Sequence, residues 1–312
     1  MKNYNIFLIL CLGLLFQCKS SKNLIQTEPK PMELYLCIGQ SNMAGRAPIE
    51  LQDQDTIPNV FLFTGNEEHP WEKAANPFNK YSTVRKRLDL QKIGPSYSFS
   101  KEMIKDNPIT KIGLIVNAKG GTSIEEWKPG DTLYNEAISQ AKKAMKLGVL
   151  KGIIWHQGEA NAGRADAYMP KIKALIEALR KDLNSPNIPF VAGQLSSDKP
   201  KRIEFNKMIL ELPTQVKNTA VVTSEHTSTI DKTHFDSASQ RVLGKRYAIK
   251  MKELLSKIKI KKMIKTLKVF RFFSIAWLSV YTGPRDQKSD KAKYIINYFR
   301  SAFRKNHDSK RV

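Results

Sequence analysis

Short apolar runs alternate along the chain with longer stretches in which apolar positions recur at helical spacing. The runs that favour buried strands span residues 33–38, 111–117, 152–156, 188–192 and 219–223. The stretches that favour amphipathic helices span residues 96–105, 134–146, 165–183 and 237–255. This alternation predicts a central, mainly parallel sheet with helices on both faces, which is a three-layer α/β/α sandwich.

Two regions depart from this pattern. Residues 50–95 are irregular and rich in proline, and we expect this excursion after the first strand to form a wall of a substrate site. Residues 257–312 begin with alternating lysine and isoleucine and continue into an aromatic apolar run. The charge-free part of that run is well short of the ~20 residues that cross a bilayer. A basic amphipathic helix lying on an anionic membrane is one interpretation, and an appendage outside the fold is the other.

The first residues have the pattern of an export signal. Lys2 precedes an apolar run from Ile6 to Phe16, and Cys18 follows that run, as in a bacterial lipoprotein signal over residues 1–18. We expect an exported protein, periplasmic or on the cell surface, that is lipid-anchored at Cys18. Ordinary signal cleavage and a retained anchor are the alternatives. Residues 19–32 would be a tether, residues 33–256 the folded domain and residues 257–312 a basic extension.

The charge of the chain is concentrated near its end. The net charge is +23, and residues 251–312 hold 17 Lys and Arg against 4 Asp and Glu. A basic tail could attract nucleic acid, but the export signal argues against nucleic acid as the partner. No disulfide framework is expected, because Cys37 falls in a core strand, where it should be an inert apolar side chain.

Ser41 stands where the first strand ends in a turn flanked by Gly39 and Gly45. The glycines permit a sharp exit, and the carboxyl end of a strand is where α/β folds hold their ligands. Serine is a poor nucleophile unless a base, an orienting acid and an oxyanion hole accompany it. A candidate for each of these groups occurs further along the chain.

Gly120 and Gly121 follow the second predicted strand, and their N–H groups could face an anion without a Cβ in the way. A plain turn between strand and helix explains them equally well. Polar residues also end the strand at 152–156, where Gln157 could donate to an oxyanion and His156 or Glu159 could ligate a metal or orient a base. No matching cluster supports a metal, so we expect His156 to be a structural hydrogen-bonding residue.

Asp231 precedes His234 by three residues, in a loop ahead of the helix that begins at Ser237. This spacing lets the carboxylate reach one imidazole nitrogen while the other nitrogen faces the serine. A surface loop with no catalytic role remains the alternative for this motif alone. We expect Asp236 to cap the helix.

Together these segments resemble the SGNH hydrolases, and in particular the branch that contains sialate O-acetylesterases and the acetylxylan esterases of carbohydrate esterase family 6. The resemblance covers residues 33–251 and rests on Gly39-Gln40-Ser41-Asn42-Met43, Gly120-Gly121-Thr122-Ser123, His156-Gln157-Gly158-Glu159 and Asp231-Lys232-Thr233-His234. It implies a flavodoxin-like strand order, Ser41 as nucleophile and His234 as base. The implied oxyanion hole consists of the Ser41 N–H, an N–H of the Gly120-Gly121 pair and the Gln157 side chain.

The resemblance leaves the orienting acid open between Asp231 and Glu159, of which we favour Asp231. Arg85 and Tyr97 fall in a family-like stretch, but the sequence gives them no role. The expected function is a serine esterase, with no cofactor, that removes O-acetyl groups from acetylated xylan, sialic acid or a similar glycan. The alternative is a noncatalytic protein on the same fold that binds carbohydrate or a membrane surface.

Overall fold

A computed structural model describes residues 31–282 of the chain. The chain divides into two units, Met1–Pro31 and Met32–Val312, and all the described helices and strands belong to the second unit. The predicted export signal, Cys18 and most of the tether lie outside the described residues, as do residues 283–312 of the basic extension.

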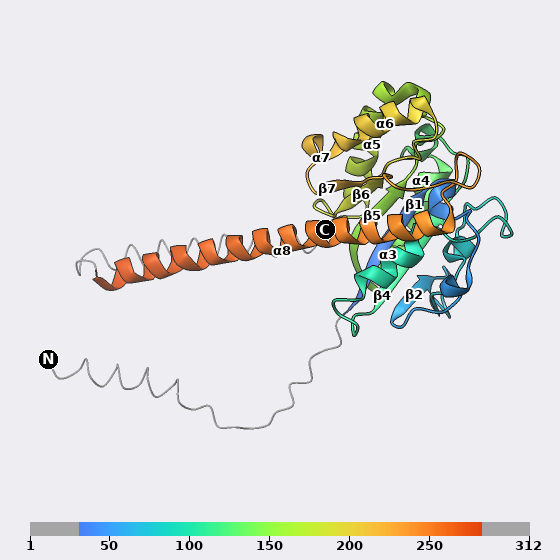
Figure 1. Cartoon of the computed structure of the whole chain (residues 1–312). Coiled ribbons are helices and arrows are strands. Elements are labelled where there is room, and N and C mark those ends of the chain that lie inside the picture. The colour runs from blue at the N-terminus through green and yellow to red at the C-terminus, as the bar shows by residue number, and fades with distance from the viewer. Residues whose placement is uncertain (1–30, 283–312) are drawn as a thin grey trace. The chain divides into compact units, whose positions relative to one another are not determined.

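The fold is built on one seven-stranded sheet with the order β3-β2-β4-β1-β5-β6-β7 (Figure 1). The strands are β1 (Met32–Gly39), β2 (Val60–Phe63), β3 (Trp71–Lys73), β4 (Ile112–Ala118), β5 (Gly148–His156), β6 (Phe190–Gly193) and β7 (Thr219–Val222). Every neighbouring pair is parallel except β2 and β3. Without β2 and β3, the order is that of the flavodoxin-like folds, as expected.

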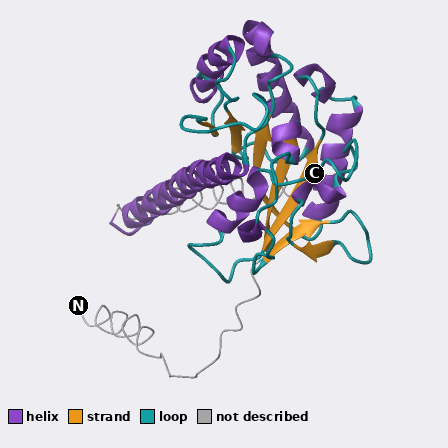
Figure 2. Ribbon diagram, turned by 45° about the vertical axis from the view of Figure 1, so that its right-hand side comes forward, coloured by secondary structure: helices purple, strands orange, loops and turns teal. Residues whose placement is uncertain are grey.

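Helices cover both faces of the sheet (Figure 2). The apolar core on one face includes side chains of α3 (Pro95–Met103) and α8 (Ser237–Thr282). The core on the other face includes side chains of α4 (Thr132–Met145), α5 (Ala165–Asp182), α6 (Pro200–Leu210) and α7 (Leu212–Gln215). Because successive side chains of a strand point to opposite faces, Leu36 of β1 joins the second core and Cys37 joins the first. The three-layer sandwich is confirmed.

The structure adds elements that the apolar pattern did not indicate. The irregular segment 50–95 contains β2 and β3, which extend the sheet beyond β4, and two 3₁₀ turns at Leu51–Asp53 and Phe78–Tyr81. Two more 3₁₀ turns, Ile124–Trp127 and Ala162–Arg164, follow β4 and β5, and a one-turn helix, α2 (Ser41–Ala44), follows β1. Helix α6 was also unexpected, because the apolar positions of residues 200–210 do not form a stripe.

Helix α8 is longer than the predicted helix over residues 237–255. It continues without a break to Thr282. No glycine or proline occurs between Gly244 and Gly283, so nothing in the local sequence stops the helix before the Gly283-Pro284 pair. Asp236 caps the helix as predicted, since its Oδ1 accepts the Ser239 N–H at 2.7 Å.

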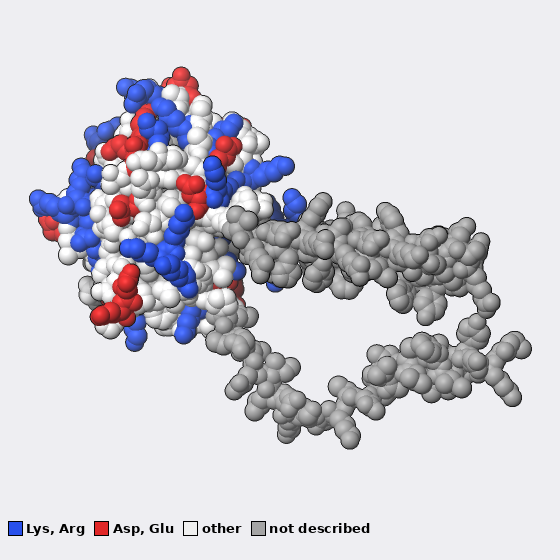
Figure 3. Space-filling model, turned by 180° about the vertical axis from the view of Figure 1, so that it is seen from behind, with Lys and Arg blue, Asp and Glu red and all other residues white. Residues whose placement is uncertain are grey.

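Cys37 is fully buried and unpaired. Burial raises the pKa of its thiol to about 12, which confirms an inert side chain. On the face of the domain shown in Figure 3, basic and acidic side chains are interspersed, without one large basic patch. Within residues 31–282, no helix is long and apolar enough to cross a bilayer.

Candidate active site

Three turns meet at the carboxyl edge of the central strands. Gly39 at the end of β1 is in register with Ala118 at the end of β4 and with His156 at the end of β5. Ser41 follows the first of these ends, Gly120 the second and Gln157 the third. Parallel pairing therefore brings segments that are far apart in the sequence to one place.

Gly39 makes this close arrangement possible. Its φ of +137° lies in the region that favours glycine, and a Cβ at this position would lie 2.2 Å from the carbonyl oxygen of His156. The chain can therefore turn from β1 into α2 directly against β5. This turn presents Ser41, only 6% exposed, at the edge of the sheet.

The loop before α8 brings His234 to Ser41. The imidazole Nε2 lies 3.0 Å from Ser41 Oγ, and Nδ1 lies 2.6 Å from Asp231 Oδ2. The other carboxylate oxygen of Asp231 accepts the N–H groups of Thr233 at 3.0 Å and His234 at 2.8 Å. The structure thus joins a carboxylate, an imidazole and a hydroxyl in one hydrogen-bonded series.

The charge state of Asp231 follows from these contacts. Partial burial alone would raise the pKa of its carboxyl, but the hydrogen bonds from His234 and Thr233 outweigh burial and lower that pKa. Asp231 is therefore a carboxylate at neutral pH. A charged acceptor on Nδ1 favours the tautomer of His234 that carries its proton on Nδ1 and leaves Nε2 free to accept.

Glu159, the other candidate acid, contacts Asn42 instead of His234. Its Oε1 accepts the Asn42 side-chain N–H at 2.5 Å. The same amide donates to the Thr233 carbonyl oxygen at 3.1 Å and accepts the Phe235 N–H at 3.1 Å. Asn42, next to Ser41 in the sequence, thereby holds the backbone on both sides of His234. We did not predict this function for Asn42. The Asn42 side chain is only 1% exposed. Because buried polar side chains are hydrogen-bonded, such burial indicates a structural role, but burial is visible only in the structure.

Gln157 is buried among polar groups. Its Nε2 lies 3.0 Å from the Thr122 carbonyl oxygen and 2.9 Å from Asn161 Oδ1. Its side-chain oxygen, Oε1, accepts the Tyr168 hydroxyl at 2.8 Å. The amide therefore joins β5 to the turn after β4, and an N–H would have to leave one of these acceptors to reach a ligand.

Two cations, Arg46 and Lys86, lie against the turn after β4. A Cβ on Gly120 would lie 2.6 Å from Arg46 Nη2 and 3.3 Å from Ser41 Cβ, so the guanidinium and the serine border the same space. A Cβ on Gly121 would lie 3.2 Å from Lys86 Nζ. Arg46 is half-buried, which lowers its pKa by desolvation, and its Nη1 donates to the carbonyl oxygens of Gly45 and Leu90. Among the described residues, neither cation has an acidic partner.

His156 lies beneath the site as a structural residue. The Tyr247 hydroxyl donates to the Trp155 carbonyl oxygen at 2.9 Å, so it accepts the Nδ1 proton of His156, also at 2.9 Å. Complete burial lowers the pKa of this imidazole, which is therefore neutral. Within residues 31–282, no cluster of three or more potential ligands could hold a metal ion.

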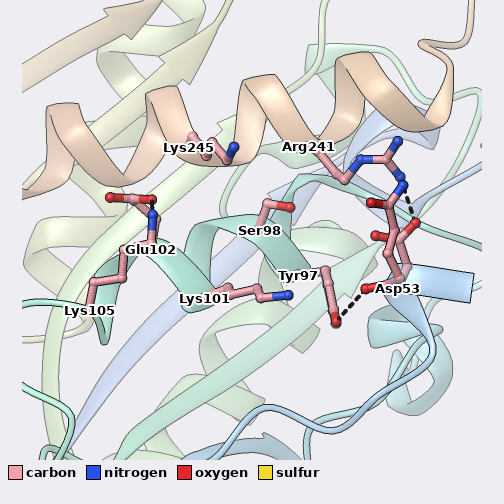
Figure 4. Close-up of a pocket in the computed structure, with 9 residues that line it drawn as sticks. Asp53, Tyr97, Ser98, Lys101, Glu102, Lys105, Arg241 and Lys245 are labelled. Atoms are coloured by element: carbon pink, nitrogen blue, oxygen red, sulfur yellow. Dashed lines mark hydrogen bonds and ion pairs between the residues drawn. The ribbon is translucent and has the colours of Figure 1, made fainter.

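Arg85 and Tyr97 do not join these groups. Arg85 donates to the Ser82 carbonyl oxygen at 2.6 Å. Tyr97 lines a pocket between α3 and α8, where its hydroxyl donates to the Gln52 carbonyl oxygen at 3.3 Å (Figure 4). That pocket is lined by neither Ser41 nor His234.

Two proteins with similar sequences are both described as esterases. The chain is 28% identical over 191 residues to an Arabidopsis thaliana protein described as "Probable carbohydrate esterase", a match that covers 55% of this chain and 72% of the relative. It is 31% identical over 120 residues to the sialate O-acetylesterase of Homo sapiens, a match that covers 29% of this chain and 23% of the human protein.

Solved structures show the same fold. A structure of a protein from Arabidopsis thaliana has a TM-score of 0.64 at 24% identity and covers 72% of this chain and 99% of its own. A carbohydrate acetylesterase from Xanthomonas citri has a TM-score of 0.54 at 21% identity and covers 72% of this chain and 56% of its own.

The sequence over residues 31–253 matches the family described as "Carbohydrate esterase, sialic acid-specific acetylesterase". This range contains every strand of the sheet and the segments that hold Ser41, Gln157 and His234. The match covers most of the chain and reaches from the tether into α8. The chain belongs to this family of carbohydrate esterases.

Proposed function

We propose that the protein is a serine esterase that removes O-acetyl groups from carbohydrate. The observation that carries this proposal is the hydrogen-bonded series Asp231–His234–Ser41. In this geometry Nε2 can take the hydroxyl proton as Ser41 Oγ bonds to the acetyl carbonyl carbon. The imidazolium then returns the proton to the sugar oxygen as the ester bond breaks, which leaves an acetyl-enzyme. Water attacks this acetyl group by the same route and releases acetate and free Ser41.

The negative charge on the carbonyl oxygen needs donors that are already in place. Among the described residues, no acceptor takes the backbone N–H of Ser41 or of Gly120, and a Cβ on Gly120 would lie only 3.3 Å from Ser41 Cβ. We propose these two groups as the first members of the oxyanion hole, with an N–H of Gln157 as a third donor.

The decisive experiment measures acetate released from 4-nitrophenyl acetate and from a panel of O-acetylated glycans. Hydrolysis of both the small ester and at least one glycan is expected. A purified, folded protein that binds acetylated glycans but releases no acetate would favour the noncatalytic alternative.

The third donor can be tested by itself. We expect Gln157→Ala to lower kcat by ~10²–10³ with little change in KM, as for a donor that acts on charge formed in the transition state. Asn161→Ala removes a neighbouring acceptor of the same amide and serves as the control, with a much smaller loss expected. A rise in KM at constant kcat in Gln157→Ala would assign this residue to substrate binding.

The charge beside Ser41 bears on the substrate. Arg46 and Lys86 approach the Gly120-Gly121 turn without acidic partners among the described residues, so a carboxylate on the sugar would meet two cations close to the ester. We therefore propose an acidic O-acetylated sugar, such as an acetylated sialic acid, in preference to neutral acetylated xylan.

This preference gives a second prediction. Arg46→Met should reduce kcat/KM for an O-acetylated acidic sugar by ~10–100-fold, and Lys86→Met by less, because Lys86 is more exposed. Turnover of 4-nitrophenyl acetate, which has no carboxylate, should stay within about threefold of wild type in Lys86→Met. Equal losses on acidic and neutral substrates would contradict a carboxylate site.

We further propose that the protein is exported and anchored through a lipid on Cys18, as its N-terminal sequence indicates. Mass spectrometry of the protein extracted from membranes tests this assignment. A mature chain that keeps the first 17 residues, or one that carries no lipid, would contradict it.

A further inference from the structure

Helix α8 carries an apolar face that the domain leaves uncovered. Four side chains form this apolar stripe, with exposed fractions of 48%, 55%, 46% and 57% for Ile260, Met263, Ile264 and Leu267. Their spacing of i, i+3, i+4 and i+7 places them on one side of the helix. Apolar side chains that form a continuous exposed patch, unlike apolar residues scattered singly over a surface, indicate an interaction site.

The opposite side of α8 faces the domain. Leu255, Ile258, Lys259 and Lys262 line a groove together with residues 149–151 and 185–189. Since an α-helix turns by 100° per residue, Leu255, Ile258 and Lys262 lie roughly opposite the apolar stripe. The stripe therefore points away from the folded domain, and its exposed fractions show that no described residue covers it.

The charge around the stripe limits what this partner can be. Lys257 and Lys261 are exposed and border it, and no Asp or Glu occurs from residue 254 to residue 285. A second copy that packed the same stripe against this one would bring lysines together without compensating acids. A partner with an apolar interior and a negatively charged surface would fit both the apolar stripe and the lysines that border it.

We propose that the apolar stripe lays α8 on an anionic lipid membrane. The four apolar side chains would enter the boundary between headgroups and acyl chains, and the bordering lysines would meet the lipid phosphates. The helix would lie on the membrane without crossing it, in keeping with the absence of a spanning helix in residues 31–282. This inference does not depend on the proposed esterase activity.

Vesicle sedimentation of residues 19–312, which contain the whole unit Met32–Val312, tests the proposal. The stripe variant replaces Ile260, Met263, Ile264 and Leu267 by serine. The control variant replaces four exposed apolar residues of the domain, all outside residues 50–95, by serine, namely Ile109, Leu147, Ile203 and Leu210. The vesicles are either pure phosphatidylcholine or contain about 30% phosphatidylglycerol.

We expect the wild-type chain to bind the anionic vesicles at least about tenfold more tightly than the neutral ones. Binding should weaken as salt rises from about 0.05 M to about 0.5 M, because the lysine contacts are screened. The stripe variant should lose at least about tenfold in affinity, while the control variant should stay within about twofold. Esterase turnover of a soluble ester should be the same in all three proteins.

Three outcomes would overturn the proposal. Equal binding of the stripe variant and the wild type would show that the stripe does not contact lipid. Equal binding to neutral and anionic vesicles would remove the role of the lysines. A wild-type dimer in light scattering that becomes a monomer in the stripe variant, without vesicles, would identify a second copy of the chain as the partner.

Discussion

Replacing Ser41 by alanine is expected to lower turnover of every ester substrate by about 10³-fold or more. The acetyl-enzyme requires a bond from Ser41 Oγ to the carbonyl carbon, and alanine has no atom that can form it. The fold should persist, because the hydroxyl makes one side-chain hydrogen bond, to His234, and the alanine methyl fills the place of Cβ. Release of 4-nitrophenol and acetate, followed together with circular dichroism, measures both effects.

Ser100→Ala is the matched control for this prediction. Ser100 is also a buried serine in a helix, and its hydroxyl donates to the Tyr97 carbonyl oxygen at 2.9 Å, away from His234. Its loss should change turnover by no more than about threefold. Activity of Ser41→Ala within tenfold of wild type would remove Ser41 from the mechanism.

The second large effect is expected from Asp231→Asn, with a loss in kcat of about 10²–10⁴-fold. An asparagine can present its amide N–H to Nδ1, which favours the tautomer of His234 that cannot accept the Ser41 proton. It also removes the negative charge that stabilises the imidazolium. Glu159→Gln should lower kcat by less than about tenfold, because a glutamine oxygen can still accept the Asn42 N–H.

Two comparisons make this prediction specific. Asp198→Asn changes a loop carboxylate that accepts the Thr229 hydroxyl, and it should leave kcat unchanged. The loss in kcat in Glu159→Ala should lie between the losses in Glu159→Gln and Asp231→Asn, since the alanine leaves the Asn42 amide without its acceptor. A greater loss in Glu159→Gln than in Asp231→Asn, with both proteins folded, would make Glu159 the residue that orients His234.

Most of the sheet could be predicted because its central strands are continuous apolar runs, as expected for parallel strands buried on both faces. Strand β2 has the same character but is only four residues long and lies between prolines, and β3 is a three-residue strand at the edge. Such short segments take their structure from pairing rather than from their own sequence. The extent of α8 was missed for a different reason, because its apolar pattern changes after Leu255 although nothing ends the helix.

The candidate site was predicted as a set of residues but not as a set of contacts. Asp231 and His234 could be paired because only three positions separate them in one loop. Asn42 and Glu159 are 117 positions apart, and their hydrogen bond depends on the register between β1 and β5, which sets where the two strands end relative to each other. The approach of Arg46 to Gly120 depends in the same way on side-chain direction, which periodicity does not determine.

The burial of Cys37 has a practical consequence for spectroscopy. In a chain that begins at Lys19, Cys37 is the only cysteine of the sequence, and burial makes its thiol unreactive toward ordinary reagents. A cysteine introduced at Met263 would therefore be the single site that takes up a spin label or an environment-sensitive fluorophore. Attached there, such a probe would report directly whether this face of α8 is surrounded by water or by hydrocarbon.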